Sequence, residues 1–191
     1  MDQISYNRID TLHPIWREDV KKAYTEANNE LGKRCRLRIS YAIRTWLEQG
    51  ALYAQGRESM ANINAKRKLA GMPPLTSSAE AKRIVTSAKP GDSFHQYGLA
   101  FDIVILYDTD GNGTFEKPSW DTKMDFDKDG ISDWLEVTRI FTKYGYQNGF
   151  IKNGKKWDLP HFQKTFGMEI PILRKRYENK EFIPGTTYVR L

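Results

Sequence analysis

The first strongly patterned stretch of the chain is helical. Apolar side chains recur at three- and four-residue spacing between residues 16 and 31, as Trp16, Val20, Ala23, Tyr24, Ala27 and Leu31. This is the period of a helix with one buried face. Gly32 follows as a helix stop. The pattern therefore predicts a helix over about 14–31.

Strand-like patterns follow in three places. Apolar residues alternate with polar ones over 36–41, which predicts a strand with one buried face, and the nearly continuous apolar run 99–107 predicts a strand in the core of a sheet. Near the end, Asn153-Gly154 separates residues 150–152 from 155–157 and is a strong signal for a two-residue hairpin turn. We expect these strands to form a small antiparallel sheet.

Two more helices are predicted around these strands. Thr45 and Glu48 have the spacing of a capping box, and Gly56 can end the helix that they begin. Apolar residues lie on one face of a helix over 132–144. The fold class is therefore α+β, with helices flanking the sheet in a single domain that spans residues 1–191.

The segment 57–92 is harder to interpret. It is polar, it is interrupted by Pro73-Pro74, and only a short helix from Ser77 to about Ser87 is expected within it. It reads as a long surface excursion. Such an excursion could form one wall of a binding groove or could be surface that touches no ligand, and the sequence favours neither.

Composition and chain ends exclude several classes. An apolar share of 39% in 191 residues suffices for one core. The single Cys35 rules out an internal disulfide and is expected to be a buried strand residue. No apolar run approaches 18 residues, and the N-terminus lacks the apolar segment of a signal peptide. We therefore expect a monomeric protein that is made in the cytoplasm without a signal peptide and has no membrane partner.

The net charge of +6 suits a polyanionic partner, which could be a nucleic acid or an anionic polymer of the bacterial wall. Charge alone does not choose between them. Lys and Arg are scattered along the chain, and no recognised nucleic-acid module surrounds them. We expect a solvated basic surface and no nucleic-acid partner.

Two short stretches carry candidate metal chemistry. His95 precedes Asp102 by seven residues across a turn at Gly98, and His161 follows Asp158 by three residues across Pro160. A catalytic zinc ion usually keeps three protein ligands and leaves a fourth position to water. His95, Asp102 and His161 supply such a set, and Asp158 becomes the candidate general base. A structural zinc site would be richer in cysteine.

These residues match a family pattern, S-x-H-x-x-G-x-A-x-D with D-x-P-H-x-Q. The chain resembles the peptidoglycan-cleaving metallopeptidases, which include D-alanyl-D-alanine carboxypeptidases and the L-alanyl-D-glutamate endopeptidases of phage endolysins. The resemblance covers roughly residues 35–165. It implies that His95, Asp102 and His161 bind zinc and that Asp158 is the base.

The resemblance extends upstream to Arg44, Gln49 and Tyr53. Arg44 is the candidate oxyanion stabiliser or carboxylate clamp, because its planar fork suits a carboxylate, although a surface ion pair is about equally expected. Gln49 could add a polar contact to substrate. Ser93 could orient a metal ligand by a hydrogen bond, or it could simply belong to the turn.

Calcium is implied by a second motif. Residues 125–136 reproduce the ligand spacing of an EF-hand loop, with Asp125, Asp127 and Asp129 at positions 1, 3 and 5. The remaining positions of the loop are filled by the Ile131 carbonyl, by Asp133 through water and by Glu136 as a bidentate acid. Position 8 is Ser132, so pairing with a second EF-hand loop is not expected.

A partial copy of this loop lies upstream in the same insert, which spans about 108–136. Asp108, Asp110 and Asn112 match its first positions, but position 12 falls on Ser119 and lacks the acid. These residues could donate to a shared calcium site or form an acidic solvated loop. By likeness to calcium-responsive phage members of the family, we hypothesise that calcium orders the insert.

The sequence leads to one function and two alternatives. The first choice is a zinc endopeptidase that cuts the L-alanyl-D-glutamate bond of peptidoglycan stem peptides, as in a phage or prophage lysin acting on the cell wall. A D-alanyl-D-alanine carboxypeptidase is the alternative within the enzyme class. A non-catalytic calcium- or wall-binding module is the alternative outside it, and the presence of Asp158 beside three intact ligands favours the enzyme.

Overall fold

The computed structural model describes the backbone of residues 2–149, 151–152, 155–156 and 158–191. Its contacts divide the chain into two compact units. Unit 1 comprises Met1–Ala42 and Leu99–Lys164, and unit 2 comprises Ile43–Gly98 and Thr165–Leu191. The single-domain organisation expected from the chain length stays a prediction.

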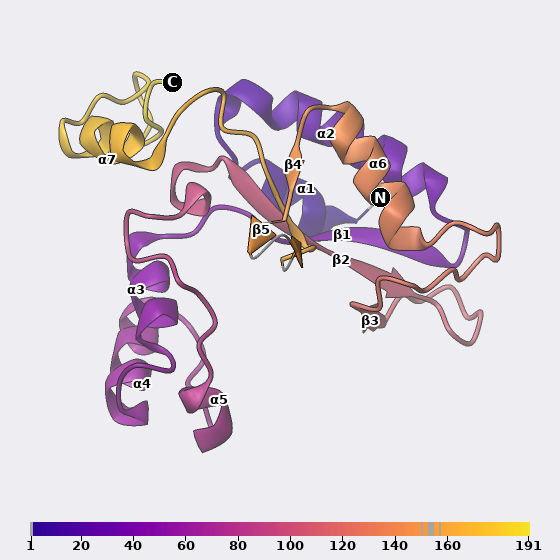
Figure 1. Cartoon of the computed structure of the whole chain (residues 1–191), viewed down its shortest axis with the longest axis horizontal. Helices are drawn as coiled ribbons and strands as arrows, with labels where there is room; N and C mark the ends of the chain where they lie inside the picture. The colour runs from indigo at the N-terminus through magenta and orange to yellow at the C-terminus, as the bar shows by residue number, and fades with distance from the viewer. Residues whose placement is uncertain (1, 150, 153–154, 157) are drawn as a thin grey trace. The chain divides into compact units, whose positions relative to one another are not determined.

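Unit 1 contains a small antiparallel sheet, as expected for an α+β fold (Figure 1). Its strands are β1 (Cys35–Tyr41), β2 (Ala100–Tyr107), β3 (Lys117–Ser119), β4 (Gln147–Asn148) and β7 (His161–Gln163). The order is β1-β2-β7-β4, and β3 pairs with the C-terminal part of β2. Strand β2 is therefore the centre of the sheet, and its N-terminal part pairs with β7.

A second, two-stranded sheet pairs β5 (Ile151–Lys152) with β6 (Lys155–Lys156). Its register agrees with a hairpin that has a two-residue connection. The predicted turn residues Asn153 and Gly154, and their neighbours Phe150 and Trp157, lie outside the described residues.

The helices of unit 1 are α1 (Gln3–Ile9), η1 (Pro14–Trp16), α2 (Arg17–Glu30) and α6 (Asp133–Lys143). The predicted helices over 14–31 and 132–144 are thus confirmed, except that the first begins with a 3₁₀ turn. Helix α1 was not predicted because it buries only Ser5 and Ile9, and a single buried apolar residue gives no helical period. The buried Ser5 hydroxyl accepts a hydrogen bond from the Ile39 amide, 2.9 Å away, and donates to Asp2.

An aromatic cluster holds the sheet of unit 1 to α6. The ring of Phe101 (β2) lies 5.4 Å from Phe141 (α6) and 5.8 Å from Phe162 (β7), and Phe141 lies 4.8 Å from Phe162. All three side chains are fully buried. Since side chains alternate along a strand, the residues that follow Phe101 and precede Phe162 point to the opposite face of the sheet.

Unit 2 is helical and corrects the expectation for residues 57–92. It contains α3 (Trp46–Ala54), α4 (Met60–Leu69), α5 (Ser78–Lys82), η2 (Phe94–Tyr97) and α7 (Ile170–Glu178). The capping box that begins α3 is present. The prediction of a long surface excursion is wrong, because residues 60–69 of this segment form helix α4. The helix after Ser77 ends at Lys82 rather than near Ser87.

Helices α3, α4 and α5 share a small core of Ala54, Ile63 and Ala81. Only Ile63 of α4 is buried, so the sequence offered little apolar periodicity from which to predict this helix. Polar contacts complete the packing: the Asn64 side chain accepts from the Leu75 amide and donates to its carbonyl, at 2.8 and 3.0 Å. No described helix of the chain is both long enough and apolar enough to cross a membrane.

Candidate active site

Asp102 and His161 lie opposite each other on neighbouring strands of unit 1. Strands β2 and β7 pair in a register that puts Asp102 directly across from His161, which brings the two side chains together on one face. His161 Nδ1 lies 3.2 Å from Asp102 Oδ1. The imidazole is buried, whereas the carboxylate is partly exposed.

Gln163 contacts the second nitrogen of the His161 ring. Its Oε1 lies 3.0 Å from His161 Nε2, and its Nε2 donates to Gln147 Oε1 at 3.0 Å. When the carboxamide oxygen accepts a hydrogen bond from Nε2, the ring presents the lone pair of Nδ1 to Asp102. Two electron-rich atoms at this distance repel each other unless a proton or a metal ion lies between them.

The geometry of the pair fits a metal ion. Two ligands that bind a tetrahedral zinc ion at about 2.0–2.2 Å lie roughly 3.3–3.6 Å apart, close to the separation of Asp102 Oδ1 and His161 Nδ1. A hydrogen bond from the second ring nitrogen to a neighbouring oxygen is the usual support of a metal-binding histidine. The structure therefore contains a possible His/Asp metal site.

Asp158 begins the turn that leads into β7. Its carbonyl accepts from the His161 amide at 3.2 Å, and the Pro160 carbonyl accepts from the Ile103 amide at 3.0 Å. The chain also approaches Gly149 closely, where a Cβ atom would lie 3.0 Å from the Asp158 carbonyl oxygen. These contacts hold the backbone between Asp158 and His161 in one conformation against the sheet.

His95 belongs to unit 2, where it lies in η2. Its carbonyl accepts from the amides of Arg44 and Gly98, at 3.1 and 3.2 Å. Gly98 has a left-handed conformation (φ 68°) that ends the 3₁₀ turn. The turn predicted at Gly98 is confirmed. Ser93 precedes η2, but its side chain does not cap it, and its role in orienting a metal ligand stays a prediction.

Arg44 and Gln49 form one hydrogen-bonded group within unit 2. Arg44 Nη1 donates to Gln49 Oε1 at 2.9 Å, and Gln49 Nε2 donates to the Ala88 carbonyl at 2.6 Å. The Gln49 side chain is fully buried, whereas Arg44 is half-buried. Gln49 is therefore placed to orient the Arg44 guanidinium rather than to lie at the surface.

The segment that carries His95 is braced by the C-terminal helix. Asp92 forms an ion pair with Arg174 of α7. Trp46 packs on Tyr177 of α7, with ring centroids 4.7 Å apart. Gly91 lies beneath these groups, and a Cβ atom there would be 2.9 Å from the Trp46 ring and 3.1 Å from Arg174 Nε. Residues 91–97 are thus enclosed by packing on α7 and α3.

We expect Gly91→Ala to destabilise the protein by about 2–4 kcal/mol. The positive φ of 91° strains any side chain, and the added methyl group would also overlap the Trp46 ring. Gly71→Ala is the matched control, because its φ of 69° is also positive but nothing lies within 4 Å of the new methyl. It should cost only about 1–2 kcal/mol. Equal losses in denaturant unfolding would contradict the packing argument.

The EF-hand-like loop gathers acidic side chains within unit 1. Asp125, Asp127 and Asp133 each offer an oxygen, and these oxygens lie within 4.8 Å of one another. Asp127 packs directly against Gly32: a Cβ atom built on Gly32 would lie 2.6 Å from the Cβ of Asp127. Asp129 accepts instead from the Ile131 amide, at 2.7 Å. Three of the predicted ligands are therefore brought together in the described part of the chain.

Glu136, at position 12 of this loop, is buried on α6. Within the described residues its Oε2 has no hydrogen-bond partner, and neither does Asp125 Oδ1. Burial, reinforced by Asp129, Asp127 and Asp133, raises the pKa of Glu136 to about 7. A cation bound by the loop would satisfy both orphaned oxygens and relieve the repulsion.

Asp133 is engaged by the protein itself. Its Oδ2 accepts from the Tyr107 hydroxyl at 2.6 Å, and its Oδ1 lies 3.3 Å from the Phe126 amide that donates to it. Burial raises its pKa. These bonds tie the loop to the end of β2, and the water-mediated role expected at position 9 stays a prediction.

The partial loop is satisfied by its own backbone. Asp108 accepts from the amides of Gly111, Asn112 and Gly113, at 2.7–3.1 Å, and Asp110 accepts from Asn112. These bonds lower the pKa of Asp108, although burial opposes them. Among the described residues, no acidic side chain of the partial loop joins the cluster of Asp125, Asp127 and Asp133. A calcium site shared by the two loops therefore stays a prediction.

Sequence reasoning missed two supports of the site, Gln163 and the segment around Arg174. Gln163 stands in the D-x-P-H-x-Q motif, and its spacing of two from His161 puts both side chains on one face of a strand, which was a usable signal. The contact between Arg174 and Asp92 joins residues 82 positions apart, and nothing local in the sequence indicates it.

The chain is similar to one known family and to two named proteins. A profile of the family "VanY: D-alanyl-D-alanine carboxypeptidase" matches residues 11–159. The peptidoglycan L-alanyl-D-glutamate endopeptidase CwlK of Bacillus subtilis (strain 168) is 33% identical over 153 residues, which cover 80% of this chain and 72% of CwlK. A crystal structure of the Serratia marcescens L-Ala D-Glu endopeptidase ChiX is 21% identical, with a TM-score of 0.40, and the match covers 87% of this chain and 90% of that one.

Proposed function

Because the chain belongs to the VanY family of D-alanyl-D-alanine carboxypeptidases, we propose that it is a metallopeptidase that hydrolyses the stem peptides of bacterial peptidoglycan. The Asp102–His161 pair carries the proposal, since its geometry fits two ligands of one metal ion. The identity with CwlK favours the bond between L-alanine and D-glutamate. The family description favours the second candidate, removal of terminal D-alanine.

The metal in this proposal is zinc, held by His95, Asp102 and His161. Two imidazoles with one carboxylate are a usual ligand set of catalytic zinc, and two members of the set, Asp102 and His161, lie 3.2 Å apart within unit 1. When bound, zinc lowers the pKa of its water towards about 7 and polarises a carbonyl. Calcium prefers oxygen ligands and is not expected there.

Asp158 is the proposed general base. It would take a proton from the attacking water and return it to the leaving amine, so that one carboxylate serves both halves of the reaction. Its backbone is held by the turn that ends at His161, which suits a group that must stay in one place. The half-buried position of Asp158 leaves it accessible to substrate.

Arg44 is the proposed oxyanion stabiliser or carboxylate clamp. Stem peptides carry free carboxylates, and a planar guanidinium binds a carboxylate through two parallel hydrogen bonds. In this role Gln49 acts through Arg44, because its own amide is buried and bonded on both sides. Ser93 directly precedes η2, the turn that carries His95, and is proposed to orient that ligand.

The test is digestion of purified peptidoglycan by the zinc-loaded protein, with mass spectrometry of the fragments. Cleavage between L-alanine and D-glutamate supports the endopeptidase, whereas release of D-alanine supports the carboxypeptidase. No cleavage by folded protein that holds zinc and calcium would leave a non-catalytic wall- or calcium-binding module as the better description.

We propose further that the complete loop binds one calcium ion through Asp125, Asp127, Asp129, the Ile131 carbonyl and Glu136, with Asp133 acting through water. The support is the orphaned oxygens of Asp125 and Glu136. Calcium would then order the insert of residues 108–136. Full activity after calcium removal, with zinc retained, would count against a regulatory role and leave a structural one.

Glu136→Gln is expected to change stability in opposite directions with and without calcium. The metal-free protein should become more stable, because a buried carboxylate near three others is replaced by a neutral amide. The stabilisation by calcium should largely vanish. In the wild type this stabilisation should reach about 2.7 kcal/mol at a calcium concentration 100 times the Kd. Thermal unfolding with and without calcium measures both effects.

Asp110→Asn is the control for this experiment. It removes an acid from the partial loop, where the side chain accepts hydrogen bonds from the amide and the side chain of Asn112. The calcium increment should stay as in the wild type. A loss as large as that of Glu136→Gln would instead show that the two loops share one site.

A further inference from the structure

The excess positive charge of the chain lies entirely in unit 2. Unit 2 has 13 Lys and Arg against 7 Asp and Glu, whereas unit 1 has 17 of each. Within unit 2 the charge is concentrated in residues 60–89, here called the basic arm, which holds six Lys and Arg and a single acid, Glu80. Lys and Arg are spread over both units, but the excess of positive charge belongs to one part of the fold.

Most cations of the basic arm are exposed and unneutralised. Lys66 pairs with Glu58, and Arg67 donates to the Pro73 carbonyl. The remaining four, Lys68, Lys82, Arg83 and Lys89, are all exposed, and none forms an ion pair with a described residue. Exposed like charges repel each other, so their gathering favours an anionic partner.

The arm presents these cations on a defined scaffold. Lys68 lies in the last turn of α4 and Lys82 in the last turn of α5, and the two helices pack on the core of Ala54, Ile63 and Ala81. The Gln55 side chain and the Gly56 amide donate to carbonyls of α5, at 2.9 and 2.8 Å. Two of the four cations, Lys68 and Lys82, are therefore held on packed helices, and Arg83 directly follows α5.

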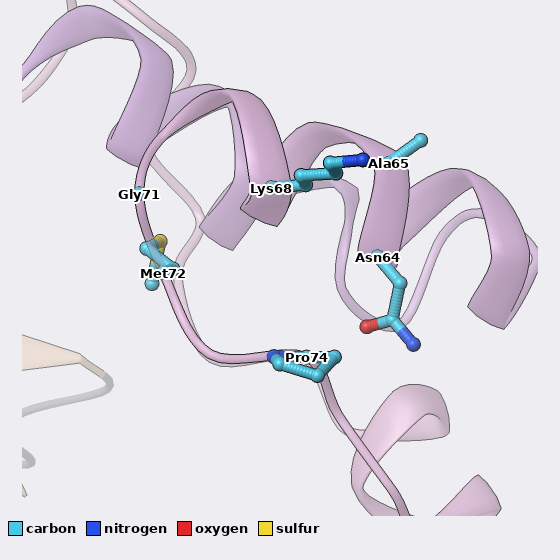
Figure 2. Close-up of a pocket in the computed structure, with 6 residues that line it drawn as sticks. All are labelled: Asn64, Ala65, Lys68, Gly71, Met72 and Pro74. Carbon is cyan, nitrogen blue, oxygen red and sulfur yellow. The ribbon is translucent and has the colours of Figure 1, made fainter.

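A hollow of about 460 Å³ lies beside Lys68. Figure 2 shows Asn64, Ala65 and Lys68 on α4, with Met72 and Pro74 on the segment that follows. Its lining is mainly apolar, with one cation and one carboxamide. Such a hollow suits the carbon chain between two phosphates better than a phosphate itself.

We propose that the basic arm binds an anionic, phosphate-bearing polymer of the bacterial wall. Charge complementarity carries the proposal: repeated phosphates match the four exposed cations, and the hollow beside Lys68 accepts the polyol or sugar between them. The arm would hold the protein on the wall, where its substrate lies, and would contribute nothing to bond cleavage itself.

The test compares two variants with the same loss of charge. The arm variant carries K68Q, K82Q, R83Q and K89Q. The control variant carries K22Q, K117Q, K123Q and R139Q, which are three exposed lysines and one exposed arginine of unit 1. Binding to purified sacculi that keep their phosphate polymer is measured by co-sedimentation from about 0.05 to 0.5 M salt, alongside hydrolysis of a soluble stem peptide.

The arm variant should bind these sacculi roughly tenfold more weakly or worse near 0.15 M salt, with a shallower salt dependence, because fewer counterions are released. The control variant should bind as the wild type does, and both should hydrolyse the soluble peptide as the wild type does. Sacculi stripped of phosphate polymer by hydrofluoric acid should bind wild type and arm variant equally. Because binding is read directly, the result does not depend on which bond is cleaved.

Three outcomes would overturn the proposal. Equal losses of binding to sacculi in both variants would show that binding depends on the net charge of the protein and not on the position of the cations. An undiminished difference between wild type and arm variant on stripped sacculi would assign the arm to the peptidoglycan itself. Tighter arm-dependent binding to duplex DNA, or to vesicles of anionic lipid, would assign it to another partner; the vesicles are included because Ile84 and Val85 are exposed beside Arg83.

Discussion

Replacing Asp158 with alanine is expected to lower kcat for stem-peptide hydrolysis by about 10²–10⁴-fold, the usual contribution of a general acid–base group. The zinc content should be unchanged, because the proposed ligands all remain. The backbone should also remain in place, since Asp158 is held there by its carbonyl oxygen and not by its side chain alone. The measurement is kcat with a soluble stem peptide, together with the zinc content of the same preparation.

Asp121→Ala is a suitable control for the Asp158 variant. Asp121 is an exposed acid of unit 1 whose side chain accepts from the nearby Lys123 amide, and it belongs to neither proposed metal site. Its loss should leave kcat within a factor of two or so. A normal kcat in Asp158→Ala would remove Asp158 from the mechanism, and a loss of zinc in that variant would make it a ligand instead.

Replacing His161 with alanine should abolish zinc binding and reduce activity to background. One of three ligands disappears, and Asp102 loses the imidazole that faces it at 3.2 Å. Removal of even a group that supports a ligand typically costs 10–100-fold in metal affinity, so the loss of a ligand should exceed that. Zinc affinity is measured by competition with a chromogenic chelator, which needs no substrate.

His13→Asn is the matched control among the three histidines of the chain. His13 is also buried, but its Nδ1 accepts from the Ile15 amide at the start of η1. Asparagine can accept the same bond. Zinc affinity should therefore stay within about threefold of the wild type. Retention of full zinc affinity by His161→Ala would refute the proposed ligand set.

The central strands and the main helices could be predicted because their signals are local. The nearly continuous apolar run 99–107 indicates a buried strand, and the stripe from Trp16 to Leu31 has the period of a helix; both elements are present. Asp102 and His161 could be paired because their motifs are short and specific. The structure adds the register that places them opposite each other.

The missed features share one physical cause, which is that their contacts are polar or distant in sequence. Helix α4 buries only Ile63, and α1 is anchored by the buried hydroxyl of Ser5. Arg174 reaches Asp92 from the end of the chain. Neither periodicity nor a motif reports such contacts, so residues 57–92 looked like a loop and the clustering of the exposed cations was not visible.

The cross-strand position of Asp102 and His161 also bears on how the chain is held together. These two residues are 59 positions apart in sequence, and β7, which carries His161, is a strand of only three residues. An ion bound to both would act as a staple that closes this long loop and fixes the register of a short strand. Since the entropy of loop closure rises only slowly with length, the intervening chain is free to carry acidic loops and a helix, as long as the staple stays closed.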